Sequence, residues 1–224
     1  QMRATADGLV GTVGGGRLEN AALRRARELL GGETGPRTER YDVVQDLGMS
    51  CGGTMKVLFE PMTPEPRLVI FGAGHIAEPL CAMAALAGFS VTVCDERPEW
   101  LTEARFPAAQ ERLLAPWTEL PRLAQVTPAA FVASVSPGHA VDVQVVRALA
   151  ALGAQPRYLG VIGSQRKGVL IRKELADAGL PSSWVDAIHS PMGLDIGAAD
   201  PREIAVSIVA QLVAVLRGVN ATGS

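Results

Sequence analysis

The strongest constraint on the fold is the segment 67–95, RLVIFGAGHIAEPLCAMAALAGFSVTVCD, which predicts a strand, a glycine-rich turn, a helix and a second strand. Residues 68–71 are a short apolar run, as expected of a strand that is buried on both faces of a parallel sheet. Residues 72–77, GAGHIA, fit the pattern G-x-G-x-x-G/A that joins strand and helix in a dinucleotide-binding unit. Asp95 follows the second strand, about 20 residues after the turn, where such units place an acid on the ribose.

The residues of this turn form the first candidate binding site. Gly72 allows the tight turn, and Gly74 lets the backbone approach a phosphate. Ala77 is small enough for the helix to lie close to the strand. We include His75, in the same turn, among the cofactor-binding residues.

Two charged residues after the second strand bear on the ligand. Asp95 suits a ribose diol, whereas Arg97 would suit a 2′-phosphate, so NAD and NADP both stay open. A strand end with ordinary surface charges is the alternative interpretation. Nothing resembles the Tyr-x-x-x-Lys pair of short-chain reductases, and no metal-binding spacing is present. The sequence therefore predicts no catalytic residue and no metal ligand.

Strands and helices continue to alternate after this unit. The predicted strands cover 112–114, 130–135 and 158–162, and the predicted helices cover 139–152 and 165–178. A last helix is expected to start at Pro201, with Asp200 as its N-cap. Such alternation predicts a parallel sheet with helices on both faces.

The first 60 residues predict a smaller domain of a different kind. Its expected strands lie at 9–13, 40–44 and 55–60, and its helix at 17–30. Residues 61–66, PMTPEP, hold three prolines, which cannot continue a helix or a central strand, so this segment should be a linker. The predicted fold class is α/β: a small N-terminal α+β domain at 1–60, that linker, and a Rossmann-like doubly wound parallel-sheet domain at 67–224.

The composition argues against several classes of partner. The formal net charge of −2 gives no reason to expect nucleic acid or an anionic membrane. The apolar runs are too short to span a bilayer, which takes about 20 residues. The three cysteines cannot all pair and form no C-x-x-C, which favours a reducing cytoplasm over a disulfide-bonded scaffold.

A glycine triplet in the first domain is the second candidate site. Gly14, Gly15 and Gly16 precede a predicted helix, where free N–H groups attract anions. Arg17 could add a charged fork to a phosphate. A tight strand-to-helix turn with Arg17 in solvent fits the residues equally well.

Cys51 and two later loops complete the candidate sites. Cys51 lies among glycines, where its sulfur would be accessible to a partner, although cysteine is also among the most buried residues. The loops 136–139 and 163–167 each follow a strand, so both should face the same crevice as the first turn. In the second loop, Gly163 and Ser164 could contact a phosphate or carboxylate, or Ser164 could simply cap a helix.

One pair of side chains on the predicted helix 139–152 has acid–base spacing. His139 and Asp142 lie three residues apart on a predicted helix and could share a face. No third partner accompanies this pair, so we assign it no catalytic role.

Five sequence blocks together resemble the XdhC/CoxI family, the accessory proteins for maturation of xanthine dehydrogenase and related molybdenum hydroxylases. The blocks are GTVGGGRLE at 11–19, DLGMSCGG at 46–53, FGAGHIA at 71–77, GVIGSQRK at 160–167 and PMGLDIGA at 191–198. The resemblance implies a protein that binds the molybdenum cofactor, a pyranopterin bearing a phosphate. It further implies that a cysteine desulfurase replaces an oxo ligand with sulfur before the cofactor passes to the apo-hydroxylase. A second copy of the chain is a further expected partner.

Two departures from the family pattern qualify this expectation. Many relatives carry Cys after the glycine triplet, where this chain has Arg17, so a sulfur role is unavailable at that position. Relatives also usually begin with a further strand and a Gly-Ser-x-Pro-Arg-like loop, so we expect the first domain to be truncated at its start. An NAD(P)-dependent oxidoreductase and a nucleotide-sensing module remain the alternatives to a non-catalytic maturation chaperone.

Overall fold

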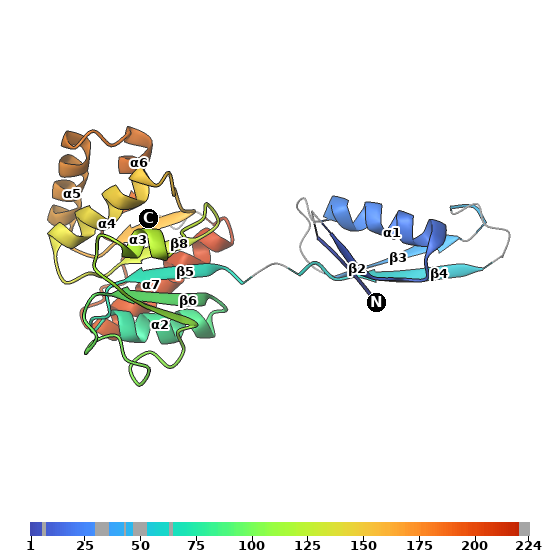
Figure 1. The fold of residues 1–224 in the computed structure, drawn as a ribbon, viewed down its shortest axis with the longest axis horizontal. Helices are drawn as coiled ribbons and strands as arrows, with labels where there is room; N and C mark the ends of the chain where they lie inside the picture. Colours follow the sequence, from blue (N-terminus) through green and yellow to red (C-terminus); the bar gives the residue numbers. More distant parts are fainter. Residues whose placement is uncertain (6–7, 30–35, 43, 47–52, 63–64, 220–224) are drawn as a thin grey trace. The chain divides into compact units, whose positions relative to one another are not determined.

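The chain forms two compact units in the computed structural model, Gln1–Pro64 and Glu65–Ser224 (Figure 1). The structure describes residues 1–5, 8–29, 36–42, 44–46, 53–62 and 65–219. The boundary between the units lies within the proline-rich segment 61–66. We propose that the two units are the two domains expected from the sequence, with this segment as their linker.

The N-terminal unit combines one helix with two antiparallel strand pairs, β1 with β2 and β3 with β4. Its elements are β1 Met2–Ala4, β2 Leu9–Gly11, α1 Gly16–Leu29, β3 Arg37–Asp42 and β4 Thr54–Phe59. The apolar stripe of α1 buries Leu18, Ala22 and Leu29, and the last two pack in one cluster with Phe59 of β4. Val13, just before the glycine triplet at the start of α1, packs against this small core.

A six-stranded parallel sheet forms the centre of the C-terminal unit. Its strands are β5 Arg67–Phe71, β6 Ser90–Asp95, β7 Glu111–Leu114, β8 Phe131–Ser134, β9 Tyr158–Val161 and β10 Ile188–His189. The spatial order is β10-β9-β8-β5-β6-β7, so the chain runs outward from β5 on one side and then returns to continue from β8 on the other. Open α/β sheets bind ligands beyond the carboxyl ends of the strands at such a reversal, here between β5 and β8.

Helices cover both faces of this sheet, as Figure 1 shows. They are α2 Ala77–Leu86, α3 Leu120–Leu123, α4 His139–Ala151, α5 Gln165–Asp177, α6 Ser182–Asp186 and α7 Pro201–Leu216. Leu80 of α2 and Ile208 of α7 belong to the core on one face, and Leu149 of α4 and Ile171 of α5 to the core on the other. The structure thus confirms the predicted fold class.

Two prolines show how the sequence determines helix starts. Pro79 lies in the first turn of α2, where its missing N–H would have no intrahelical acceptor. Pro201 is the first residue of α7, and Asp200 caps this helix in a reciprocal capping box with Glu203. The predicted N-cap at Asp200 is confirmed.

Candidate functional site

The glycine-rich turn after β5 lies where the strand order reverses. Gly72 donates its N–H to the carbonyl oxygen of Cys94 at 2.8 Å, which ties the turn to β6. A Cβ atom on Gly72 would lie 2.4 Å from the carbonyl oxygen of Val135, just after β8. Its φ of +113° is also one that L-residues rarely adopt. The close approach of β5, β6 and β8 therefore requires glycine at this position.

The next residues leave backbone donors open at the start of α2. The N–H groups of Gly74, His75 and Ile76 have no acceptor among the described residues. A Cβ atom on Gly74 would meet nothing within 4 Å, so this side of the turn is open. Donors at a helix N-terminus carry partial positive charge and bind phosphates. This geometry suits the phosphate contact that the sequence predicts for Gly74.

Asp95 is buried beneath the turn. Its side chain is 0% exposed, and Oδ2 accepts the N–H of Ala73 at 2.7 Å. The guanidinium of Arg97 donates to both carboxylate oxygens, at 2.9 and 2.8 Å. Burial by itself would raise the pKa of Asp95, but the hydrogen bonds from Arg97 and Ala73 outweigh burial and hold the pKa below its usual value. In this arrangement Asp95 stabilises the turn, and a ribose hydroxyl would have to displace Arg97.

An aromatic and basic cluster flanks the turn. Arg105 donates to the carbonyl oxygens of Ala73 and Trp100, each at 3.0 Å. Its guanidinium carbon lies 4.7 Å from the centroid of the Trp100 ring, and His75 meets that ring edge-on at 5.3 Å. Arg105 is 32 residues from Ala73 along the chain, and no motif contains both. The sequence therefore did not predict this cluster.

A second cluster joins the loops that follow β8 and β9. Asp142, in the first turn of α4, is 0% exposed, and its Oδ1 accepts the hydroxyls of Ser134 and Ser136 at 2.6 and 2.7 Å. Its Oδ2 accepts the ammonium group of Lys167 at 2.6 Å. The sequence placed the two loops in one crevice but did not indicate this cluster, because Asp142 and Lys167 are 25 residues apart on different helices.

Gly163 and Ser164 shape the loop that carries Lys167. A Cβ atom on Gly163 would lie 2.5 Å from Cδ of Lys167, so the missing side chain lets the lysine stem cross the loop. The hydroxyl of Ser164 accepts the N–H of Lys167 at 3.3 Å and caps α5. Ser164 thus has the helix-capping role that the sequence allowed, and its part in ligand binding stays a prediction.

His139 does not pair with Asp142. Its Nε2 lies 2.7 Å from Oε2 of Glu174 on α5, and its Nδ1 is buried with no hydrogen-bond partner in the described structure. Asp142 instead faces the two serines and Lys167. The acid–base pair suggested by the spacing of His139 and Asp142 is therefore wrong.

The glycine triplet at the start of α1 contacts a carboxylate of the same chain. Oε2 of Glu19 accepts the N–H groups of Val13 and Gly15, at 3.3 and 3.2 Å, and the hydroxyl of Thr12. The Thr12 hydrogen bond, with those from the two N–H groups, lowers the pKa of Glu19. The Glu19 carboxylate thus accepts the N–H of Gly15, one of the donors that the sequence predicts for a phosphate. Arg17, beside the triplet, is exposed.

The cysteines that the structure describes are buried thiols. Burial raises the pKa of Cys81 to about 11 and also raises that of Cys94, so neither is a thiolate at neutral pH. Cys51, the predicted sulfur contact, lies outside the described residues. Within the described ranges, no three His, Cys, Asp or Glu side chains gather into a metal site. No helix in those ranges is long and apolar enough to cross a membrane.

Two family models match the chain. The model described as the XdhC Rossmann domain matches residues 68–212, which include the turn after β5 and the loops after β8 and β9. The model described as the XdhC and CoxI family matches residues 1–42, which include the glycine triplet and Glu19. The two matches together therefore cover the turn after β5, the loops after β8 and β9, and the glycine triplet.

Similar proteins match the chain along most of its length. The uncharacterized protein YqeB of Escherichia coli K12 is 33% identical over 96% of this chain and 40% of its own length. A Bacillus subtilis protein, named as a probable xanthine dehydrogenase subunit, is 36% identical over 71% of this chain and 46% of its own length. The chain thus spans less than half of each of these two relatives.

A solved structure supports the same relationship. The crystal structure of a xanthine dehydrogenase from Bacillus halodurans is 25% identical in sequence and has a TM-score of 0.61. The match covers 94% of this chain and 84% of that chain, so it includes both units. With the Rossmann-domain match and the two relatives, these findings show that the chain belongs to the XdhC and CoxI family.

Proposed function

We propose that this chain is part of an accessory protein that binds the molybdenum cofactor, supports its sulfuration and delivers it to a xanthine dehydrogenase-type hydroxylase. Its family membership supports this role. The name of the Bacillus subtilis relative, which describes a probable component of xanthine dehydrogenase, associates a similar sequence with such an enzyme.

The open start of α2 is the observation that carries the proposal. The family's ligand bears a phosphate, and a phosphate needs several donors on one small patch of backbone. Gly74, His75 and Ile76 supply three N–H groups without an acceptor in the described structure, and a Cβ atom on Gly74 would meet nothing within 4 Å. These residues fit the phosphate of the cofactor. Its molybdenum would supply the redox and sulfur chemistry, while this chain binds the phosphate and orients the ring system.

Other candidate contacts have less support. The loop at Gly163 and Ser164 follows β9, which is separated from β5 only by β8, so it would face the ring system of a ligand held at Gly74. A phosphate at the Gly14–Gly16 triplet would have to displace Glu19 from the N–H of Gly15. Cys51 stays a proposed sulfur contact.

The proposed partners are an apo molybdenum hydroxylase, a cysteine desulfurase and a second copy of this chain, all in the cytoplasm. The apolar row of α7, with Ala205, Ile208 and Leu212, is buried in the core that it shares with α2. A homodimer would therefore use a surface other than this row.

An NAD(P)-dependent oxidoreductase is the second candidate, because the glycine-rich turn is typical of dinucleotide-binding folds. The position of Asp95 argues against it, since both carboxylate oxygens already accept hydrogen bonds from Arg97. A nucleotide-sensing module would depend on the same turn and meets the same objection. Both alternatives require a rearrangement that binding of a phosphate at Gly74 does not.

A thermal-shift comparison of three ligands tests the proposal. The chain is titrated with molybdenum cofactor, NAD(H) and NADP(H), and a ligand at about 100 times its dissociation constant adds about 2.7 kcal/mol to the free energy of unfolding. We expect stabilisation by the molybdenum cofactor and none by either nucleotide. Stabilisation by a nucleotide alone would contradict the proposal and favour an oxidoreductase or a sensor.

A further inference from the structure

Lys167 is a partly exposed cation whose position is determined by buried groups. Its ammonium nitrogen lies 2.6 Å from Oδ2 of Asp142, whose side chain is 0% exposed. The hydroxyls of Ser134 and Ser136 donate to the other oxygen of the same carboxylate. Three donors offset the cost of burying this charge, so Asp142 can serve as a fixed anchor for the ammonium.

The ammonium group retains donors for a ligand. A lysine ammonium has three N–H donors, and the described residues provide one acceptor, on Asp142. The Lys167 side chain is 24% exposed, so an acceptor from outside the protein can reach it. A Cβ atom on Gly163 would lie 2.5 Å from Cδ of Lys167, so a side chain at residue 163 would displace this stem.

The loops that carry Lys167 and the open turn lie at the same edge of the sheet. β5 pairs with β8, and β8 pairs with β9, all in parallel, so the ends of β5 and β9 are separated by roughly 10 Å. Lys167 reaches back from the β9 side to Asp142, which is hydrogen-bonded to Ser134 at the end of β8, so its ammonium lies between these two strand ends. A ligand with its phosphate at Gly74 and a ring system beside it can therefore contact both sites.

We infer that Lys167, positioned by Asp142, forms a second polar subsite that binds an acidic or carbonyl oxygen on the ring system of a phosphate-bearing heterocycle. The phosphate of this ligand lies at Gly74 and its ring system extends across β8 to Lys167. Asp142 acts through Lys167 and is a positioning residue. The inference rests on the proposed function, which it deepens by assigning the two ends of the ligand.

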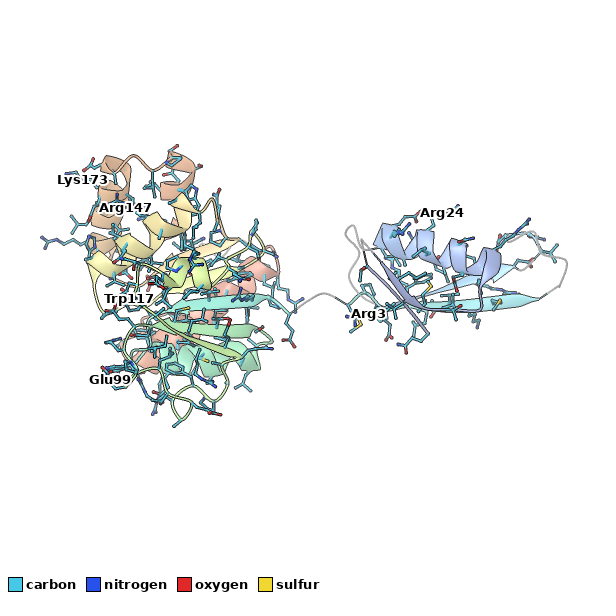
Figure 2. All side chains as sticks on the ribbon, viewed as in Figure 1. Arg3, Arg24, Glu99, Trp117, Arg147 and Lys173 are labelled. Carbon is cyan, nitrogen blue, oxygen red and sulfur yellow. The ribbon has the colours of Figure 1, made fainter. Side chains whose placement is uncertain are left out.

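The test compares a charge-neutral double variant with a matched surface change. Asp142→Asn with Lys167→Met removes both charges together, so no buried charge is left unpaired. The asparagine oxygen can still accept the two serine hydroxyls. Lys173→Met is the control, because Lys173 is an exposed lysine on the same helix, α5 (Figure 2). The probes are molybdenum cofactor and inorganic phosphate, each measured by equilibrium titration.

We expect the double variant to bind molybdenum cofactor at least about tenfold more weakly, which is the loss of one charge-assisted hydrogen bond. Its affinity for inorganic phosphate should match that of the wild type, and Lys173→Met should change neither affinity. Unchanged cofactor affinity in the double variant would overturn the subsite and leave the proposed function standing. No cofactor binding by the wild type would overturn both.

Lysine labelling of the unmutated chain gives a second readout that does not depend on how a variant folds. An amine-reactive reagent is applied with and without molybdenum cofactor, and modification is quantified at each lysine by mass spectrometry. Bound cofactor should protect Lys167 and leave the reaction of Lys173 unchanged. Equal labelling of Lys167 with and without saturating cofactor would contradict the subsite.

Discussion

At the scale of single residues, two acids turn inward onto backbone N–H groups in turns that the sequence predicts for anionic ligands. Asp95 accepts the N–H of Ala73 in the turn after β5. Glu19 accepts those of Val13 and Gly15 before α1. The first acid leaves the donors of Gly74 open, whereas the second accepts the N–H of Gly15 within the triplet, so the two turns differ in the donors that they offer.

Replacing Glu19 should open the glycine triplet to anions. In Glu19→Ala, the N–H groups of Val13 and Gly15 lose their acceptor, so inorganic phosphate should bind there and shift the amide resonances of residues 13–16 in an NMR titration. The wild type and Glu28→Ala, a change at an exposed position on the same helix, should show no such shift. Equal shifts in the wild type would mean that Glu19 does not block the triplet.

The lowered pKa of Asp95 predicts how its contribution to stability depends on pH. A carboxyl whose folded pKa lies below its unfolded value stabilises the fold above the unfolded pKa, which is about 4, and loses this effect as pH falls through the folded pKa. Asp95→Asn should lower the free energy of unfolding by about 2 kcal/mol between pH 5 and 8, because it removes charge-assisted hydrogen bonds. The difference in the free energy of unfolding between the wild type and Asp95→Asn should narrow below pH 4.

Urea unfolding of the wild type and Asp95→Asn at a series of pH values measures this gap. Glu96→Gln, a change at the exposed neighbouring acid, is the control and should stay close to the wild type throughout. A gap that stays constant into strong acid would show that the charge on Asp95 is not what stabilises the turn.

At the scale of elements, the turn after β5 contains two glycines with different structural roles. Gly72 has a φ of +113° and no room for a Cβ atom beside Val135, whereas Gly74 is open and has no such backbone constraint. Gly72→Ala should therefore lower the free energy of unfolding by about 3 kcal/mol. Gly74→Ala should change it by less than about 1 kcal/mol. Denaturant titration of both variants checks this, and equal losses would contradict the assignment.

The elements themselves were largely predictable, because their signals are local. The apolar run before Gly72, the small residue at Ala77 and the capping signals at Asp200 and Pro201 each act within a few residues. The predicted helices and strands of the C-terminal unit accordingly lie close to their observed positions, whereas the short elements α3, α6 and β10 were not predicted.

At the scale of the whole molecule, the sequence predicted which loops meet but not which side chains pair. Parallel alternation implies that the loops after β5, β8 and β9 share one edge, and the observed strand order agrees. The contact of Arg105 with Ala73 and that of Lys167 with Asp142 depend on how separate loops pack. No spacing rule relates such residues. His139 and Asp142 have helical spacing, but each side chain pairs with a residue of α5, which their spacing does not indicate.

The most direct test of the central claim is the equilibrium binding of molybdenum cofactor to the wild type, Gly74→Val and Gly8→Ala. Gly74→Val places a side chain in the open space above the donors of the turn, whereas Gly8 lies in the other unit, where a Cβ atom makes only an ordinary contact with Thr5. We predict saturable binding by the wild type and Gly8→Ala, and at least about tenfold weaker binding by Gly74→Val, the equivalent of one lost charge-assisted hydrogen bond. No binding by the wild type, or equal binding by all three, would contradict the account.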